Sequence, residues 1–285
     1  MERFKLMTFN IRGCFSEAEA RNLWENRAEC NVQLIQRYDP DLIGFQEVQV
    51  PNEQTYAQHL PMYHTRPGIT ASTEKKAGWL MHNPIYWKQF EKVQCGGFFL
   101  SPTPHVWSKG WDAAYVRSAT WAIFRTANRA FLYINAHFDH IGEQARVESA
   151  KLIVQQAQAI GGDLPIIVTA DFNSRAWAPP NEDTLDYPPP IVREYLPPAN
   201  TVYDVFMQAG FRDAYLEAGH INQLDTNTYH GFIGQQFPPV ALRIDWILVR
   251  DGRFPIHVED CDIIRDHNGD IYPSDHYPVM AHLAI

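Results

Sequence analysis

This sequence has few cysteines and no long hydrophobic run, and both absences limit what the protein can be. No stretch approaches the roughly 20 consecutive apolar residues that a membrane-spanning helix needs. The N-terminal stretch MERFKLMTFN has no apolar segment after its basic residues, so we expect no secretory signal. The four cysteines are scattered and form no C-x-x-C pair, which is typical of free thiols in a reducing compartment. We therefore expect a cytoplasmic protein.

Positive charge is also in short supply. The chain has 24 Lys and Arg against 33 Asp and Glu, and its formal net charge is −9. This balance disfavours an extended grip on duplex nucleic acid, which needs many contacts between basic side chains and phosphates. A small phosphate ester is still compatible, because a metal ion can supply positive charge locally. The absence of a basic amphipathic helix disfavours a lipid hydrolase, and we expect no membrane contact.

Apolar runs and helical stripes are mixed along the whole chain, without an internal repeat or a change in composition. Alternating or short apolar runs predict strands within 4–11, 41–48, 76–83, 95–101, 115–125, 130–139, 164–173, 243–250, 256–265 and 276–285. Helical spacing predicts helices within 16–38, 142–162 and 202–215. Because strands often follow one another directly, we predict one α+β (α/β) domain over residues 1–285, with two sheets packed face to face and helices outside.

Residues 175–203 are rich in proline and have no periodicity. A loop of this length is usually a binding loop or lid, although a surface insertion without a role would look the same. Aromatic residues in this loop and around residue 110 suit stacking on a base or a sugar, and equally suit ordinary anchoring of loops to the core. They are Trp177, Tyr187, Tyr195, Trp107, Trp111 and Tyr115.

Polar side chains stand at the ends of six predicted strands, where a core strand has no use for them. They are Asn10, Glu47, His137 with Asp139, Asp171 with Asn173, Asp245, and Asp275 with His276. One buried carboxylate costs several kcal/mol unless it is paired. Five acidic side chains in such positions therefore suggest a shared partner, and divalent cations are the usual partner of oxygen ligands.

The metal-side and water-side roles follow from side-chain chemistry. Glu47, with Asn10 nearby, suits a hard cation such as Mg²⁺, which keeps several waters and takes few carboxylates. A metal bound to a phosphoryl oxygen neutralises the charge that develops there. Asp171 suits the orientation and deprotonation of an attacking water.

The two imidazoles suit hydrogen bonds to phosphoryl oxygens. They belong to His137 and His276, and either Asp245 or Asp275 could hold His276 in one tautomer and raise its pKa. Each stretch alone also has a plain structural interpretation: DFN as a turn after a strand, NAHFD as a satisfied interior histidine, and SDH as a capped turn. Their joint occurrence in this order favours a site.

The ordered stretches TFNIRG, DLIGFQEV, INAHFDHIG, IIVTADFNS, RIDWILV and SDHYPV resemble the endonuclease/exonuclease/phosphatase superfamily of metal-dependent phosphoesterases over essentially the whole chain. TYHGF at 228–232 and YVRSATW at 115–121 resemble a bacterial subgroup related to the deadenylase and nocturnin-like branch. The resemblance implies a four-layer α/β/β/α sandwich of two mixed β-sheets flanked by helices. It also implies a site at one edge between the sheets, with Mg²⁺ or Mn²⁺ as the cofactor.

The resemblance implies three sets of site residues. The metal-side set is Asn10, Glu47 and Asp275. The catalytic set is His137, Asp171, Asn173, Asp245 and His276. The substrate-binding set is Arg117, at a position that contacts phosphate in some members, and His230, within TYHGF. For Arg117 a surface ion pair is the competing interpretation.

One position departs from the pattern of the family. Many relatives have a second glutamate in the middle of the chain that partners the first catalytic histidine, and here Glu74 is the only nearby candidate. The support of His137 is therefore open. His82 is interpreted as structural.

The most direct functional hypothesis is a divalent-metal-dependent phosphoesterase that hydrolyses a phosphodiester or phosphomonoester by in-line attack of a metal-assisted water. Its expected substrate is a small or single-stranded phosphate ester, with nucleotides and single-stranded nucleic acid among the candidates, and we expect a monomer. One alternative is a DNA-repair-type endonuclease or exonuclease that acts on duplex DNA. A second alternative is a non-catalytic binding module on the same scaffold.

Overall fold

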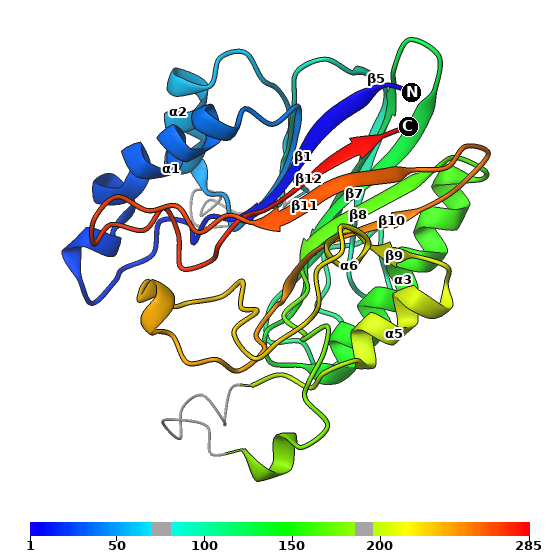
Figure 1. Cartoon of the computed structure of the whole chain (residues 1–285). Coiled ribbons are helices and arrows are strands. Elements are labelled where there is room, and N and C mark those ends of the chain that lie inside the picture. The colour runs from blue at the N-terminus through cyan, green and yellow to red at the C-terminus, as the bar shows by residue number, and fades with distance from the viewer. Residues whose placement is uncertain (70–80, 186–195) are drawn as a thin grey trace.

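In the described part of the chain, two six-stranded β-sheets face each other and helices cover their outer surfaces (Figure 1). The computed structural model describes residues 1–69, 81–185 and 196–285. The first sheet has the strand order β11-β12-β1-β2-β4-β3. Its strands are β1 (Arg3–Asn10), β2 (Leu42–Gln46), β3 (His64–Arg66), β4 (Ile85–Trp87), β11 (His257–Ile263) and β12 (Val279–Ala284).

The second sheet has the strand order β5-β6-β7-β8-β10-β9. Its strands are β5 (Glu91–Phe99), β6 (Ser118–Arg125), β7 (Ala130–His137), β8 (Ile166–Asp171), β9 (Arg212–Asp213) and β10 (Asp245–Arg250). Both sheets are mixed, because β1 is parallel to β2 and β7 is parallel to β8, whereas their other neighbours are antiparallel. The two termini lie side by side, since β1 pairs with β12 (Figure 1).

Helices form the two outer layers. α1 (Trp24–Tyr38) and α2 (Val50–His59) pack on the first sheet through a cluster that includes Trp24, Phe45 and Tyr56. α3 (Glu143–Gly161) and α5 (Thr201–Gln208) pack on the second sheet. The shorter helical segments are α6 (Ala214–Glu217), η1 (Ala20–Asn22), η3 (Glu182–Thr184) and η4 (Gly234–Gln236). The predicted four-layer α/β/β/α sandwich is confirmed.

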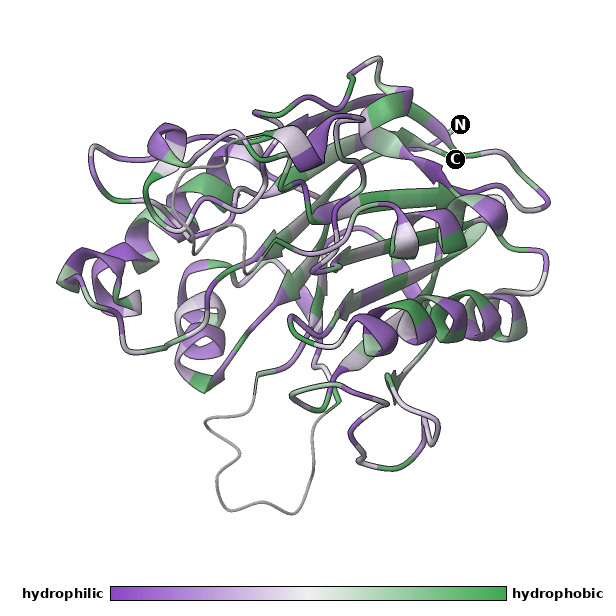
Figure 2. Ribbon diagram, turned by 90° about the horizontal axis from the view of Figure 1, so that it is seen from below, coloured by the Kyte–Doolittle hydropathy of each residue, from purple (hydrophilic) through white to green (hydrophobic). Residues whose placement is uncertain are grey.

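The space between the sheets is filled by apolar side chains from both. Phe4 on the first sheet stacks on Phe131 of the second, with ring centroids 5.4 Å apart, and meets Phe90 edge-on at 5.2 Å. Burial of each such ring stabilises the fold by about 1.5–3 kcal/mol. Figure 2 shows the same division, with strands that are largely hydrophobic and outer helices that carry both hydrophobic and hydrophilic residues.

One polar contact joins the two sheets between their apolar surfaces. Asn135 in β7 is fully buried, and its Nδ2 donates to the backbone oxygens of Phe45 at 2.8 Å and Pro84 at 3.1 Å. Its Oδ1 accepts from Gln46 Nε2 at 2.7 Å. Because both sheets supply partners, these bonds fix how the end of β2 sits against β7.

Several predicted boundaries differ from the observed ones. The first helix begins at Trp24 rather than within 16–23, after the short η1 turn. The helix predicted within 202–215 divides into α5, β9 and α6, because Gly210 has a φ of 81° and ends α5. α2, β3 and β4 were not predicted. The strand predicted within 76–83 lies mostly outside the described residues, and His82 forms only a single bridge, to Val48.

Two expectations from the sequence's absences can be compared with the structure. None of the helices in the described part of the chain has the length and apolarity that a bilayer crossing requires. The cysteines Cys14, Cys30, Cys95 and Cys261 are all free thiols, as predicted.

Close approach of the sheets at Gly44 gives a test of this packing. A Cβ atom at Gly44 would lie 2.2 Å from the Tyr133 hydroxyl and 2.6 Å from Asn135 Oδ1. Tyr133 is buried and bonded to Thr169 at 2.7 Å, so it has no room to move aside. We expect Gly44→Ala to lower the free energy of unfolding by about 2 kcal/mol through overpacking. Urea denaturation of the two proteins measures this, and an unchanged midpoint would contradict the close approach.

Candidate active site

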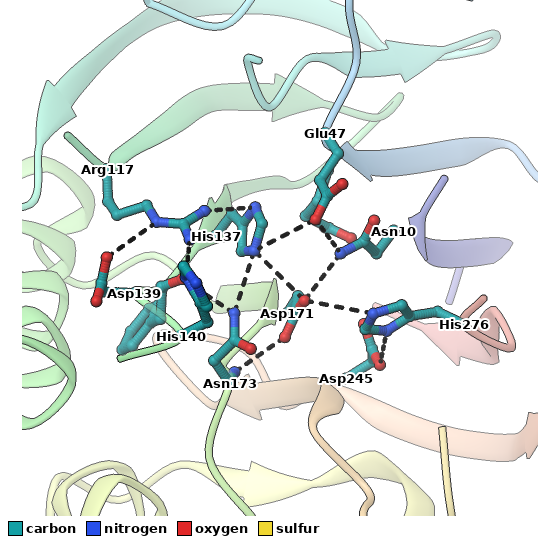
Figure 3. A network of polar contacts seen from close by, with 12 residues as sticks. Asn10, Glu47, Arg117, His137, Asp139, His140, Asp171, Asn173, Asp245 and His276 are labelled. Atoms are coloured by element: carbon teal, nitrogen blue, oxygen red, sulfur yellow. Dashed lines mark hydrogen bonds and ion pairs between the residues drawn. The ribbon is translucent and has the colours of Figure 1, made fainter. Parts of the chain in front are cut away.

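The strand ends that carry the polar residues meet at one edge of the sandwich. β7 and β8 run parallel, so His137 and Asp171 are register partners at their ends. β10 is antiparallel to β8, which places Asp245, its first residue, opposite Asp171. In the facing sheet, β1 ends at Asn10 and β2 ends one residue before Glu47. The edge therefore collects side chains from five strand termini (Figure 3).

Hydrogen bonds connect the two sheets across this edge. Asn10 Nδ2 donates to Asp171 Oδ2 at 2.8 Å and to Glu47 Oε1 at 3.2 Å. His137 Nε2 lies 3.4 Å from Asp171 Oδ2 and 3.9 Å from Glu47 Oε1. The sequence prediction that these distant residues share one site is thus matched by their positions (Figure 3).

Two site residues have left-handed backbone conformations that end their strands. Glu47 has a φ of 63° and Asn173 a φ of 46°. Asparagine tolerates this region, but for glutamate it is uncommon and costs of the order of 1 kcal/mol. The turn at Asn173 is stabilised because its backbone N–H donates to Asp171 Oδ1 at 2.9 Å. Strained residues of this kind concentrate at functional sites.

Asp171 lies at the centre of the site. Asn10 and the backbone of Asn173 bind its two oxygens, so the carboxylate has a fixed orientation. Burial, followed by repulsion from Asp245, raises the pKa of Asp171 above its ordinary value. His276 Nε2 lies 3.8 Å from Asp171 Oδ2, and its positive charge offsets part of this rise in the pKa of Asp171.

The two imidazoles differ in charge because their partners differ. His276 Nδ1 bonds to Asp245 Oδ2 at 2.9 Å. Burial opposes its charged form, but Asp245, Asp171 and Asp275 outweigh burial and raise the pKa of His276 to about 10. Burial and the nearby Arg117 guanidinium lower the pKa of His137 well below its ordinary value. At neutral pH, His276 is therefore cationic and His137 is neutral.

A cavity of about 1020 Å³ opens onto this edge. Of the predicted site residues, those that line it are Glu47, Arg117, His137, Asp171, Asn173, Asp275 and His276. Asn10 and Asp245 contact the lining residues from beneath. Its larger part is apolar and aromatic, with walls from Phe15, Trp107, Tyr115, Tyr229 and Phe237.

Sequence reasoning missed several residues of the lining. Arg12 forms ion pairs with Glu17 at 2.8 Å and Asp275 at 3.6 Å. His140 follows His137 in the stretch NAHFDH, and that second histidine was the available signal. Leu196 and Pro197, at the end of the proline-rich segment, also form part of the wall.

The end of the proline-rich segment is held by Arg175. Its Nε donates to Pro197 O at 2.7 Å, and its guanidinium pairs with Glu182. Because Asn173 lies two residues earlier, the segment that turns at the site also anchors this wall. Of the described part of residues 175–203, Leu196 and Pro197 therefore reach the cavity, while 186–195, with Tyr187 and Tyr195, lie outside the described residues.

His230 is not brought to the cavity. Its ring is fully buried and stacks on Tyr277, with centroids 4.0 Å apart, and its Nδ1 accepts from the Gly234 backbone at 3.2 Å. Burial lowers the pKa of His230 to about 3. Its backbone N–H donates to Asp275 O at 2.8 Å, so its position next to the site is structural.

Three further expectations concerned His82, Arg117 and Glu74. His82 is buried, pairs with Glu53 at 3.0 Å and bonds to Gly68, in agreement with a structural role. Arg117 is 8% exposed, which excludes a surface ion pair. Glu74 lies outside the described residues.

The donor set fits a divalent cation. The Glu47 side chain is 13% exposed, and its Oε2 has no hydrogen-bond partner among the described residues. Among the described residues, its ion-pair neighbour within 4.0 Å is His137, which is neutral. Burial and the charge of Asp275 raise the pKa of Glu47, and the charges of Arg12 and His276 offset only part of this rise, so the carboxylate favours a further cation.

The carboxylate oxygens of Glu47 are ligands of the type that Mg²⁺ and Mn²⁺ prefer. Asn10 faces Glu47 with Nδ2, and its Oδ1 accepts from the Arg12 backbone at 3.0 Å, which leaves one lone pair of that oxygen for a cation.

A second group of close ligand atoms is less suited to the cation. One ligand atom each from Asp171, Asp245 and His276 lie within 4.8 Å of one another. However, the His276–Asp245 bond already uses Nδ1, and the ring is cationic, so it is a poor ligand. Of the two groups, the Glu47 side of the site is therefore the better suited to a cation.

Comparison with known proteins agrees with this architecture. The model of the Endonuclease/Exonuclease/phosphatase family matches residues 7–276. The chain belongs to this family. The predicted family is therefore confirmed, and the chain has a phosphoesterase fold. Members of this family are in general hydrolytic phosphoesterases.

Solved structures of family members resemble the chain over its full length. An endonuclease/exonuclease/phosphatase from Bacteroides vulgatus is 29% identical, with 100% of both chains covered and a TM-score of 0.81. A mannosyl-6-phosphatase from Bacteroides thetaiotaomicron is 28% identical, with 99% of this chain and 100% of that chain covered and a TM-score of 0.78. The human nocturnin catalytic domain with bound sulfate is 20% identical, with 99% and 94% covered and a TM-score of 0.67, which shows the shared fold alone.

The buried, neutral His230 predicts a specific acid sensitivity. Its pKa is about 3 in the folded protein and about 6.5 when unfolded, so the unfolded state binds the proton first. The stability that this residue contributes is complete above pH 6.5 and is lost as the pH falls toward 3. The loss approaches about 1.4 kcal/mol per pH unit. We expect His230→Gln to flatten the dependence of urea stability on pH between 6.5 and 4, and an equally steep curve would contradict this prediction.

Proposed function

We propose that the chain is a divalent-metal-dependent phosphohydrolase in which residues 1–285 form one catalytic domain. It would cleave a phosphodiester or phosphomonoester by in-line attack of water, without a covalent intermediate. The observation that supports this most directly is the meeting of Glu47, Asp171 and His276 in one cavity, although they are far apart in sequence. Membership of a phosphoesterase family supports the reaction class.

Glu47, Asn10 and Asp275 would hold the cation. Mg²⁺ or Mn²⁺, when bound, supplies Lewis acidity and neutralises charge on a phosphoryl oxygen. Arg12 lies within 3.6 Å of Asp275 and also balances part of the negative charge. Arg12 would therefore reduce the repulsion among the acidic ligands and a negatively charged substrate.

Asp171 would orient the attacking water and take its proton. Its two oxygens are held by Asn10 and by the backbone of Asn173, so the water would meet a carboxylate of fixed direction. Burial raises the pKa of Asp171 toward neutral pH, and a general base is most effective when its pKa is close to the working pH.

His276 and His137 would donate hydrogen bonds to the phosphoryl group. His276 is charged and is oriented by Asp245, so it opposes the negative charge that grows in the transition state. Asn173 Nδ2 donates to Phe138 O at 3.1 Å and lies 3.2 Å from His137 Nε2, which places a further donor beside the same position.

The substrate that we propose is a small or single-stranded phosphate ester. The cavity is lined largely by apolar and aromatic side chains, which suits a leaving group with a sugar or base face. The mannosyl-6-phosphatase relative makes sugar phosphates the first class to test, and nucleotides the second. The net charge of −9 favours such esters over duplex DNA.

A substrate screen tests the proposed function. We expect turnover of at least one sugar phosphate, nucleotide, single-stranded oligonucleotide, poly(A) or inositol phosphate with Mg²⁺ or Mn²⁺, and its loss in EDTA. Bis-p-nitrophenyl phosphate serves as a general reporter. For a small ester the rate should change little with added salt, whereas steep salt dependence would indicate the duplex-DNA alternative. Absence of metal-dependent turnover on every substrate would favour the non-catalytic binding module.

Two single substitutions test the assigned roles. We expect Asp171→Ala and His276→Ala each to lower kcat by at least about 10²-fold, because each removes a base or a transition-state contact. Circular dichroism should show that both variants remain folded. Near-complete turnover in either variant would show that its role is assigned wrongly.

A further inference from the structure

Arg117 in the cavity wall contacts two histidines at once. It precedes β6, is 8% exposed, and its Nη1 lies 3.0 Å from His137 Nδ1. Its Nη2 lies 3.1 Å from His140 Nδ1 (Figure 3). All three side chains line the cavity. One guanidinium therefore contacts Nδ1 of both histidine rings.

These contacts decide where the ring protons are. A guanidinium has only N–H donors and no acceptor. His137 and His140 must therefore each accept at Nδ1, because a proton on that nitrogen would oppose the N–H of Arg117. A ring that accepts at Nδ1 is neutral and carries its proton on Nε2. Both rings are thus set as hydrogen-bond donors through Nε2.

For His137, the protonated nitrogen faces the reacting groups. Nε2 lies 3.4 Å from Asp171 Oδ2 and 3.2 Å from Asn173 Nδ2. Asn173 Nδ2 is a donor that binds Phe138 O, and its second N–H competes with Arg117 to donate to the ring. The guanidinium is charged and is the closer donor, at 3.0 Å against 3.2 Å, so the ring accepts from Arg117. The Nε2–H is therefore directed toward the Asp171 side of the cavity, where we place the phosphoryl group.

Asp139 holds Arg117 and the cavity rim together. Its Oδ2 lies 3.5 Å from Arg117 Nε and accepts from the Ala114 and Tyr115 backbones at 3.1 and 3.2 Å. Its Oδ1 accepts from Ile141 and Gly142 at 3.0 and 2.8 Å. The loops before β6 and after β7 are therefore joined at the residue that orients Arg117.

Tyr115 supports the second ring. It stacks on His140, with centroids 5.7 Å apart and planes inclined by 14°. His140 is therefore held by a stacking partner and by a hydrogen bond, so it has a defined orientation in the wall.

The contrast with His276 shows what this arrangement does. His276 has a carboxylate partner and is cationic, whereas His137 has a guanidinium partner and is neutral. We propose that Arg117 is a positioning residue whose two N–H contacts fix Nδ1 of His137 and of His140 as hydrogen-bond acceptors, which leaves the Nε2–H of each ring available to a phosphoryl oxygen. The catalytic consequence rests on the proposed function, whereas the protonation pattern does not. It also identifies the support of His137, which the sequence left open.

Histidine NMR tests the protonation pattern without any substrate. Long-range ¹H–¹⁵N spectra of metal-free, ¹⁵N-histidine-labelled protein distinguish protonated from unprotonated ring nitrogens, and His137→Gln and His140→Gln assign the signals. We expect both rings to show an unprotonated Nδ1 and a protonated Nε2 at pH 7. A charged ring, or a proton on Nδ1 of either ring, would overturn the proposal. This result does not depend on the folding of any Arg117 variant.

A double-mutant cycle then tests how Arg117 acts. We expect Arg117→Met to change the ring signals and to lower kcat by about 10- to 100-fold, as loss of an orienting partner does. In the His137→Gln background, Arg117→Met should lower kcat by at most a further factor of about two, because both substitutions remove the same hydrogen-bond donor. Fully multiplicative losses would show that Arg117 acts on the substrate independently. Arg125→Met is the matched control, since Arg125, the last residue of β6, is exposed and pairs with Glu91.

The two hypotheses fail in different ways. If no substrate is turned over but the NMR pattern is as expected, the proposed function fails and the arrangement of Arg117 stands. If turnover is found but Arg117→Met leaves the ring signals unchanged, the inference fails and the proposed function stands.

Discussion

The Glu47 carboxylate lies at the junction of two sheets, and its Oε2 has no hydrogen-bond partner among the described residues. Its backbone has a left-handed conformation, and it shares the Asn10 amide with Asp171. Each of these features costs stability unless something compensates. The buried Asn135 contacts between the sheets and the aromatic core supply the rigid frame that tolerates this cost. Function at this edge therefore depends on a scaffold that is strongly packed elsewhere.

The two imidazoles beside Asp171 differ in charge because different side chains neighbour them. Asp245 raises the pKa of His276, whereas burial and the Arg117 guanidinium lower the pKa of His137. A site with one charged and one neutral donor can oppose growing phosphoryl charge without repelling a bound cation from both sides. The cavity beyond these rings is mainly apolar, so charge is concentrated where the reaction would take place.

Much of this architecture was predictable from the sequence, because short or alternating apolar runs mark β1, β7, β8, β10 and β12, and the polar residues at the ends of these runs indicate a shared edge. β3 and β4 have three residues each, too few for periodicity to show, and α2 was missed although Pro51 marks its first turn. A motif does not state which way a side chain faces, so His230 was expected at the substrate but lies among tyrosines. Arg117 in the role of a histidine partner requires two loops to meet, which spacing alone cannot show.

The dependence of stability on metal, compared between the wild type and Glu47→Gln, tests the central claim most directly. Removal of a buried charge that Arg12 and His276 compensate only in part should leave Glu47→Gln at least as stable as the wild type in EDTA. Addition of Mg²⁺ or Mn²⁺ should raise the melting temperature of the wild type, because the cation binds only the folded state. The same addition should leave Glu47→Gln unchanged. A wild type that does not respond to either metal, or a variant that responds as strongly, would contradict the account.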